Sequence, residues 1–196
     1  SMALMASEVL GIPFEQINPQ VAATDSVGHT DVTGGSRTTV ATGQAVIQAA
    51  EHCVAEMCRR AAVEWEVEPG VVAWSQGAAH YGDQTLTFEE LALRAGTMGG
   101  PLTFSSSLNS TSAAPAFGVH ICDAEVDKET GRTTITRYTA IQDAGKAIHP
   151  DYVEGQMQGG AVQGIGWALN EEYLYNDEGA LENPGFLDYR IPVASD

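Results

Sequence analysis

The sequence predicts a single α+β domain in which helices pack on a mixed sheet. Three patterns predict this fold class: a long amphipathic helix at 39–63, a β-hairpin at 116–127 and 133–142, and a glycine-rich helix from Pro150 to about Glu172. A length of 196 residues suits one domain, and a hydrophobic content of 43% is enough to bury a core. We place the domain at residues 3–196, because Ser1 and Met2 resemble the remnant of a cleaved expression tag.

The first half of the chain is predicted to be helical around a polar loop. Helix formers at 3–10 end at Gly11, and a weak alternation over 14–21 favours a short strand. Residues 25–37 are rich in glycine and polar side chains and are predicted to form a loop. The helix at 39–63 follows, with apolar residues mainly at three- and four-residue steps: Val46, Ala49, Ala50, Cys53, Val54, Met57, Ala61 and Ala62.

Shorter elements complete the prediction. Two apolar runs, 71–74 and 84–88, suit strands and precede a helix at 89–95 that ends at Gly96. A glycine- and serine-rich stretch over 96–112 is predicted to be irregular. After the hairpin and the glycine-rich helix, a β-like stretch covers 180–191. No repeat, low-complexity tract or linker divides the chain.

The charge and the cysteines exclude several classes of protein. Nine Lys and Arg against 26 Asp and Glu give a net charge of −17, which argues against binding a nucleic-acid backbone. The three cysteines, Cys53, Cys58 and Cys122, lack zinc or iron–sulfur spacing and are typical of reduced thiols. The sequence has no apolar run near 20 residues and no secretion signal, so we expect a cytoplasmic protein without a membrane partner.

The stretch Thr33-Gly34-Gly35-Ser36-Arg37-Thr38-Thr39 lies directly before the long helix. A helix N-terminus has unpaired N–H groups and a partial positive charge, so phosphate oxygens bind there favourably. The two glycines allow close approach to the backbone, while the hydroxyls and Arg37 add donors. An ordinary helix N-cap at Ser36 or Thr38 is the alternative interpretation.

A second glycine-rich stretch runs from Gly155 to Gly166, with five glycines in twelve residues. Each glycine costs a helix about 1 kcal/mol relative to alanine, so close approach of a ligand or of another backbone is expected to offset that cost. Gln156 and Gln163 are two helical turns apart and share a face, where their amides suit a heterocycle edge or a phosphate oxygen. Tight helix packing through small residues is the alternative.

Other nucleotide and catalytic motifs are missing from the sequence. Gly164-Ile165-Gly166 lacks the third glycine of a dinucleotide fingerprint, and Ala140 replaces the first glycine of a Walker A motif before Gly145-Lys146. No serine lies in a Gly-x-Ser-x-Gly elbow, and the five histidines are scattered. We therefore predict no metal-ligating residue.

Taken in order, these stretches resemble the molybdenum hydroxylases, which include xanthine dehydrogenase, aldehyde oxidoreductase and carbon monoxide dehydrogenase. The resemblance covers nearly the whole chain and is to the C-terminal part of their molybdopterin-binding subunit. It rests on six stretches, each weak alone: 6–13, 34–39 with 43–46, 124–127, 143–150, 155–166 and 188–192.

The resemblance implies a molybdopterin-binding domain of the aldehyde oxidase/xanthine dehydrogenase type, serving oxidative hydroxylation of an aldehyde or N-heterocycle. It assigns cofactor contacts to Thr33, Gly34, Gly35, Ser36, Arg37 and Thr38 in the turn and to Gln156 in the later helix. The Gly-Ser-Arg form is similar to that of bacterial members, which implies molybdenum-molybdopterin in its cytosine dinucleotide form. Implied partners are the rest of the molybdenum-binding subunit, domains or subunits carrying 2Fe-2S and FAD, and a small-molecule substrate.

The resemblance also implies what this chain lacks. The family's catalytic glutamate belongs to a segment downstream of Asp196, so no catalytic residue is assigned and the fragment alone is expected to be inactive. Two other interpretations stay open at this point: a non-enzymatic module that holds a nucleotide or anion at the turn, and a structural subunit of a split enzyme.

Overall fold

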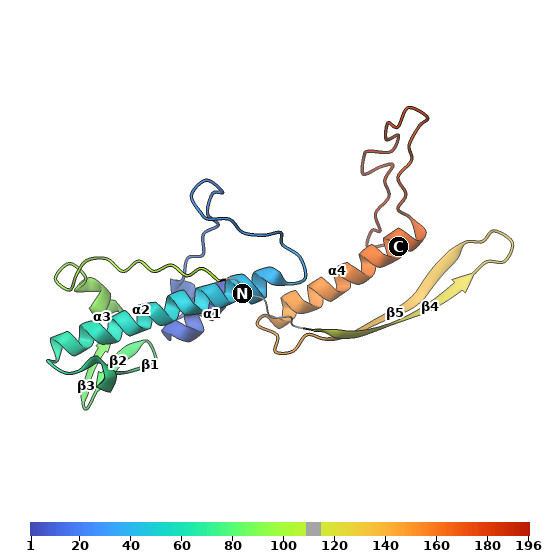
Figure 1. The fold of residues 1–196 in the computed structure, drawn as a ribbon. Coiled ribbons are helices and arrows are strands. Elements are labelled where there is room, and N and C mark those ends of the chain that lie inside the picture. Colours follow the sequence, from blue (N-terminus) through green and yellow to red (C-terminus); the bar gives the residue numbers. More distant parts are fainter. Residues whose placement is uncertain (109–114) are drawn as a thin grey trace. The chain divides into compact units, whose positions relative to one another are not determined.

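The computed structural model describes residues 1–108 and 115–196. The chain divides into two compact units, Ser1–Ser112 and Ala113–Asp196, where the sequence predicts one domain. The division falls just after the glycine- and serine-rich stretch, which carries no composition shift that distinguishes a boundary from a loop. Figure 1 shows the ribbon, and each unit is described by itself.

The first unit begins with two helices that the sequence predicts. Helix α1 (Met2–Leu10) ends at Gly11, whose left-handed φ of 70° is the expected helix stop. The predicted strand over 14–21 is wrong: the structure has a single 3₁₀ turn, Phe14–Gln16, and then irregular chain. Pro13 and Pro19 flank this segment, and a proline cannot donate a hydrogen bond to a neighbouring strand.

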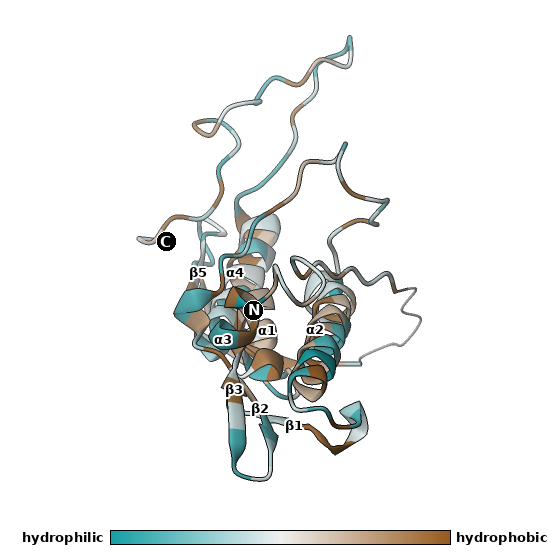
Figure 2. Cartoon of the chain, turned by 90° about the vertical axis from the view of Figure 1, so that its left-hand side faces the viewer, coloured by the Kyte–Doolittle hydropathy of each residue, from teal (hydrophilic) through white to brown (hydrophobic). Residues whose placement is uncertain are grey.

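The long helix starts irregularly and then becomes regular. A π-helical turn, η2 (Thr38–Thr42), leads into α2 (Gly43–Glu64). Figure 2 shows α2 with both hydrophilic and hydrophobic segments, as expected of a helix with one buried face. Its buried residues recur at helical spacing: Gly43, Ala50, Cys53, Met57, Arg60, Ala61 and Ala62.

A small antiparallel sheet and a short helix pack against the end of α2. The sheet has the order β1 (Ala73–Ser75), β2 (Ala78–Tyr81), β3 (Gln84–Thr87), and sequence analysis missed β2. Helix α3 (Phe88–Leu93) begins with a capping box between Thr87 and Glu90. The core of the unit forms where these elements meet, from Cys53, Met57, Ala61, Ala79, Leu86 and Leu91.

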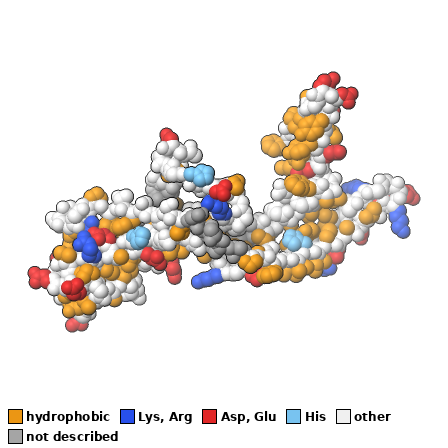
Figure 3. All heavy atoms as spheres, viewed as in Figure 1, with side chains coloured by type: hydrophobic (Ala, Val, Ile, Leu, Met, Phe, Trp, Pro, Cys, Tyr) orange, Lys and Arg blue, Asp and Glu red, His pale blue; other side chains and the backbone are white. Residues whose placement is uncertain are grey.

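The second unit is a long hairpin with one helix on it. Strands β4 (Phe117–Val126) and β5 (Thr133–Asp143) pair antiparallel, with a register shift beside Asp123. Both lie within a residue of the predicted bounds. Helix α4 (Pro150–Leu169) follows and packs against β5. Figure 3 shows hydrophobic side chains exposed along the hairpin.

The last 27 residues have little regular structure. The predicted strand over 180–191 is wrong, because only an isolated bridge, Tyr175 with Leu181, forms there. Asn183-Pro184-Gly185 interrupts the stretch, and the amide of Tyr189 donates to the carbonyl of Gly185 in a turn. The three cysteines are free. Within residues 1–108 and 115–196, no helix is long and apolar enough to cross a membrane.

Candidate functional site

The predicted turn lies at an uncovered end of the long helix. Thr33, Gly34, Gly35, Ser36 and Thr38 are all exposed, and Arg37 is half-buried. Gly35 and Ser36 both have left-handed backbone conformations, with φ of 57° and 59°. This conformation is uncommon for serine and costs free energy unless the surroundings hold it. A Cβ added at Gly34 or Gly35 would meet nothing within 4 Å, so the approach to this backbone is open.

No side chain caps this helix end. The amide of Arg37 donates to the carbonyl of Gly34 (3.0 Å), and the amide of Val40 donates to that of Ser36 (3.1 Å). Within the described chain, the amides of Ser36, Thr38 and Thr39 have no acceptor, and no hydroxyl of Ser36 or Thr38 accepts a hydrogen bond from the helix. The ordinary N-cap is therefore not what the structure shows. The free N–H groups and the helix dipole favour an anion here.

Among the described residues, Arg37 differs from the other arginines of its unit in having no carboxylate partner. Residues 1–112 hold four arginines and no lysine against twelve Asp and Glu. Arg59 and Arg60 pair with Glu56, and Arg94 pairs with Glu64 at 2.8 Å. Among the described residues, the guanidinium of Arg37 makes one long hydrogen bond, 3.5 Å to Oγ1 of Thr30. Its charge is therefore available to an anion at the turn.

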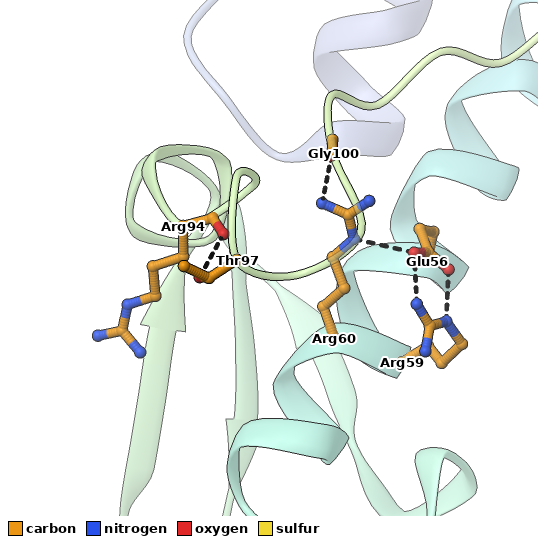
Figure 4. Close-up of polar contacts among 6 residues, drawn as sticks. All are labelled: Glu56, Arg59, Arg60, Arg94, Thr97 and Gly100. Carbon is orange, nitrogen blue, oxygen red and sulfur yellow. Dashed lines mark hydrogen bonds and ion pairs between the residues drawn. The ribbon is translucent and has the colours of Figure 1, made fainter.

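Arg59 and Arg60 are structural, and Figure 4 shows both against Glu56. Arg60 is 4% exposed; its Nε donates to Oε1 of Glu56 at 2.9 Å, and its guanidinium also donates to the carbonyl of Gly100 at 3.0 Å. Arg59 donates to both oxygens of the same carboxylate at 2.6 and 2.7 Å. These hydrogen bonds, foremost those from Arg59, lower the pKa of Glu56 to about 2. The cluster fixes the segment around Gly100 to α2.

Gln156 lies on α4 in the second unit. Helix geometry places it with Gln163 on the side away from the hairpin, and both are exposed. A Cβ added at Gly155, Gly159, Gly160 or Gly164 would meet nothing within 4 Å. Tight packing against a neighbour in this structure therefore does not explain these four glycines. Gly166 differs, because a Cβ there would clash with Glu171 and Pro192.

The described part of the second unit also has a hollow, on the other side of α4. It has a volume of about 480 Å³, and Tyr138, Ala140, Met157, Ala161 and Ile165 are among the residues that line it. Gln156 does not line this hollow. The turn and Gln156 belong to different units, so each is characterised within its own unit.

Sequence analysis treated His149 as an ordinary histidine, and its environment is unusual. The imidazole stacks on Tyr152, with ring centroids 4.0 Å apart, at the N-terminus of α4. Its Nδ1 is shielded from solvent and has no hydrogen-bond partner among the described residues. Only its position before Pro150, which begins the helix, could have drawn attention to it. No group of three or more possible metal ligands occurs in residues 1–108 and 115–196.

The open helix N-terminus of the first unit and the open glycine-rich helix face of the second are each of a kind that suits a phosphate-bearing ligand. Comparison with protein families matches residues 1–196 to the molybdopterin cofactor-binding domain. The chain belongs to the molybdenum hydroxylase family.

Individual relatives agree with this assignment. The nicotine 6-hydroxylase large subunit of Paenarthrobacter nicotinovorans is 31% identical over 98% of this chain and 25% of its own length. The xanthine dehydrogenase molybdenum-binding subunit of Escherichia coli O157:H7 is 40% identical over 50% of this chain and 13% of its own length. The solved structure of reconstituted carbon monoxide dehydrogenase from Oligotropha carboxidovorans has a TM-score of 0.82 and 27% identity, covering 99% of this chain and 25% of that one. The chain thus spans about a quarter of the length of those relatives that match nearly all of it.

Proposed function

We propose that this chain forms the part of a molybdenum hydroxylase large subunit that holds molybdenum-molybdopterin for oxidative hydroxylation of an aldehyde or N-heterocycle. The observation that carries the proposal is the turn at 33–38, where backbone amides without an acceptor and an arginine without a carboxylate partner, as judged among the described residues, lie on an open backbone. The first unit has a strongly negative charge, which repels anions at a distance. The turn therefore binds an anion only through its own local hydrogen-bond donors.

The residues of the turn fit a phosphate-bearing cofactor. Arg37 would supply a charge-assisted hydrogen bond, and the N–H groups of Ser36, Thr38 and Thr39 would donate to the phosphate, since they have no acceptor among the described residues. Thr33 and the exposed hydroxyls add donors, while Gly34 and Gly35 leave the approach free. In the second unit, Gln156 would offer its amide as donor and acceptor to a polar group of the cofactor, beside glycines that leave room for it.

The chemistry is divided between the cofactor and the protein. When bound, the molybdenum cofactor supplies the two-electron redox chemistry. The residues of this chain bind and orient it, and none of them is assigned to proton transfer. We expect the 196-residue chain alone to be inactive, because the base that the family resemblance implies is a glutamate outside these residues.

The finer features of the proposal follow from the resemblance. The Gly34-Gly35-Ser36-Arg37 form supports the cytosine dinucleotide form of the cofactor. We propose that electrons pass to 2Fe-2S and FAD centres on other domains or subunits of a cytoplasmic complex. The relatives' names support a complex, since one is a large subunit and another is a subunit of a dehydrogenase complex.

The first experiment replaces Arg37 with Gln in the full-length enzyme and measures molybdenum by mass spectrometry and released nucleotide by chromatography. Loss of a hydrogen bond from a charged group costs about 1.5–3 kcal/mol, so we expect cofactor affinity to fall roughly 10- to 150-fold. Arg132→Gln, in the hairpin turn, is the control with the same charge change. Full molybdenum and nucleotide content in Arg37→Gln would contradict the proposal. Cytidine monophosphate as the released nucleotide would support the dinucleotide form.

A second experiment tests the helix in the same way. Gln156→Leu should lower cofactor retention, because a polar group of the cofactor loses its partner at a cost of about 1–3 kcal/mol. Gln158→Leu is the matched control, because Gln158 lies on the side of α4 that lines the hollow. Wild-type cofactor retention in Gln156→Leu would remove Gln156 from the site. Release of cofactor from both would indicate damage to the helix instead.

A further inference from the structure

The outer face of the β4–β5 hairpin carries a row of large apolar side chains. Alternate residues of a strand point to opposite faces, and Tyr138 and Ala140 point toward α4, because they line the hollow with Met157. Their neighbour Ile141 therefore lies on the other face. Val119 is paired with Ile141 in the register, which places Val119, and with it Phe117 and Ile121, on the same side. We call these four residues the outer apolar face: Phe117, Val119, Ile121 and Ile141.

This face is uncovered in the described structure. Its four side chains are 70%, 57%, 49% and 55% exposed, in the order just given. On β4, the residues of the face toward α4 are Gly118, His120 and Cys122, so the more apolar side of the strand is the open one. An antiparallel sheet with one face in water normally carries polar residues on that face. The pattern is that of a sheet covered on both faces.

Polar groups border the outer apolar face at both ends. Arg137 pairs with Asp123 at 2.7 Å beyond Ile121, and Asp143 stands opposite Phe117 at the other end. An apolar centre with a polar rim is the usual anatomy of a protein interface. Between these ends, Thr139 stands opposite Ile121 and adds one hydroxyl to the centre, so a matching surface must be mainly apolar and uncharged.

The low burial of the second unit indicates that the outer apolar face needs further protein to cover it. Among the described residues of the second unit, only Ala161, Gly166 and Asn183 are buried. A two-stranded hairpin is at best marginally stable without a layer on it, and α4 supplies one layer only. Relatives that match nearly the whole chain are about four times its length. A second copy is a poor partner, because each copy has a net charge of −17.

We infer that the outer apolar face of the hairpin docks against an apolar, uncharged layer, a helix or sheet face, contributed by the rest of a large subunit. The inference rests on the proposed function in one respect, the assignment of the chain to a larger subunit. The face is then an interior surface of the complete subunit. Its residues serve assembly and do not contact the cofactor.

Thiol labelling tests this inference. Val119→Cys is made in a background in which Cys58 and Cys122 are serine, and the alkylation rate of Cys at 119 is followed by peptide mass spectrometry. It is measured in the 196-residue chain and in the full-length subunit. Lys128→Cys, in the exposed hairpin turn, is the control, and Ile141→Cys repeats the test should the first variant misfold. We expect alkylation at 119 to be at least about a hundredfold slower in the full-length subunit, because labelling a covered thiol requires local opening.

Two results would overturn the inference. Fast labelling at 119 in the full-length subunit would show a free surface. Slow labelling already in the 196-residue chain would show that this chain or a second copy covers the face. Molybdenum content, measured on the same samples, separates this inference from the proposed function: a loaded subunit with fast labelling refutes only the docking face, and an unloaded subunit with slow labelling refutes only the cofactor assignment.

Discussion

Replacing the buried arginine of α2 tests the packing of the first unit most directly. Arg60→Ala removes the guanidinium that joins Glu56 to the carbonyl of Gly100 (Figure 4). The Arg60 side chain is 5% exposed, whereas that of Arg59 is 50% exposed, although both contact the same carboxylate. The two arginines therefore form a matched pair that differs in burial and in the contact with Gly100.

The expected loss follows from these contacts. Breaking a buried ion pair by removing one partner typically costs about 3–5 kcal/mol, but Glu56 keeps Arg59 and is not left unpaired. The carbonyl of Gly100 loses a charged donor, which is worth about 1.5–3 kcal/mol. We expect Arg60→Ala to lower the free energy of unfolding by about 2–3 kcal/mol. Arg59→Ala should lower it much less, because its charge lies in water.

Urea unfolding followed by tryptophan fluorescence measures this difference in the right part of the chain. Trp65 and Trp74 belong to the first unit, and Trp167→Phe removes the signal of the second. The midpoint should fall with an unchanged slope, since a single side chain alters little of the surface exposed on unfolding. Equal losses for Arg59→Ala and Arg60→Ala would refute the reasoning, because burial would then not decide the contribution.

Three further predictions concern the same unit. The pKa of Glu56 is lowered to about 2, so its carboxylate stabilises the folded state above about pH 4.5 and loses this effect as the pH falls toward 2. The difference in unfolding free energy between wild type and Glu56→Gln should therefore shrink between pH 4.5 and 2. Thr87→Ala should cost about 1 kcal/mol in urea unfolding, because it removes the capping box of α3, whereas an unchanged midpoint would argue against the cap. Gly11→Ala should lower the unfolding free energy by at least about 2 kcal/mol, because φ is +70° and the new Cβ would clash with the backbone of Gly77. Gly70→Ala is the control, because a Cβ there lies in open space and should leave the unfolding free energy nearly unchanged.

The elements that sequence analysis predicted well are those whose signal is local. Gly11 ends a helix through its own backbone freedom, and the alternation of 116–127 and 133–142 defines a hairpin without further information. Strand β2 was missed because Ala78 and Ala79 are too small to suggest a strand; they form one because β1 and β3 pair on both sides. The π-helical turn at 38–42 has no recognisable sequence signal.

The candidate site also combines features with a local sequence signal and features that only the fold creates. That a glycine-rich turn would precede the long helix is readable from Gly34 and Gly35. That Arg37 has no carboxylate partner among the described residues cannot be predicted from the sequence, because it depends on which carboxylates the fold brings to the other arginines. Glu56 is three and four residues from its partners, a spacing visible in the sequence, but Glu64 and Arg94 are 30 residues apart and meet only in the fold.

The open glycines of α4 set the sequence of events by which the second unit forms. Each costs an isolated helix about 1 kcal/mol, so residues 150–169 on their own would populate mainly coil. The apolar side chains of α4, among them Met157, Ala161 and Ile165, gain stability where they lie beside β5, so we expect the helix to be retained once the hairpin has formed. We therefore expect α4 to become stable after the hairpin when this unit folds.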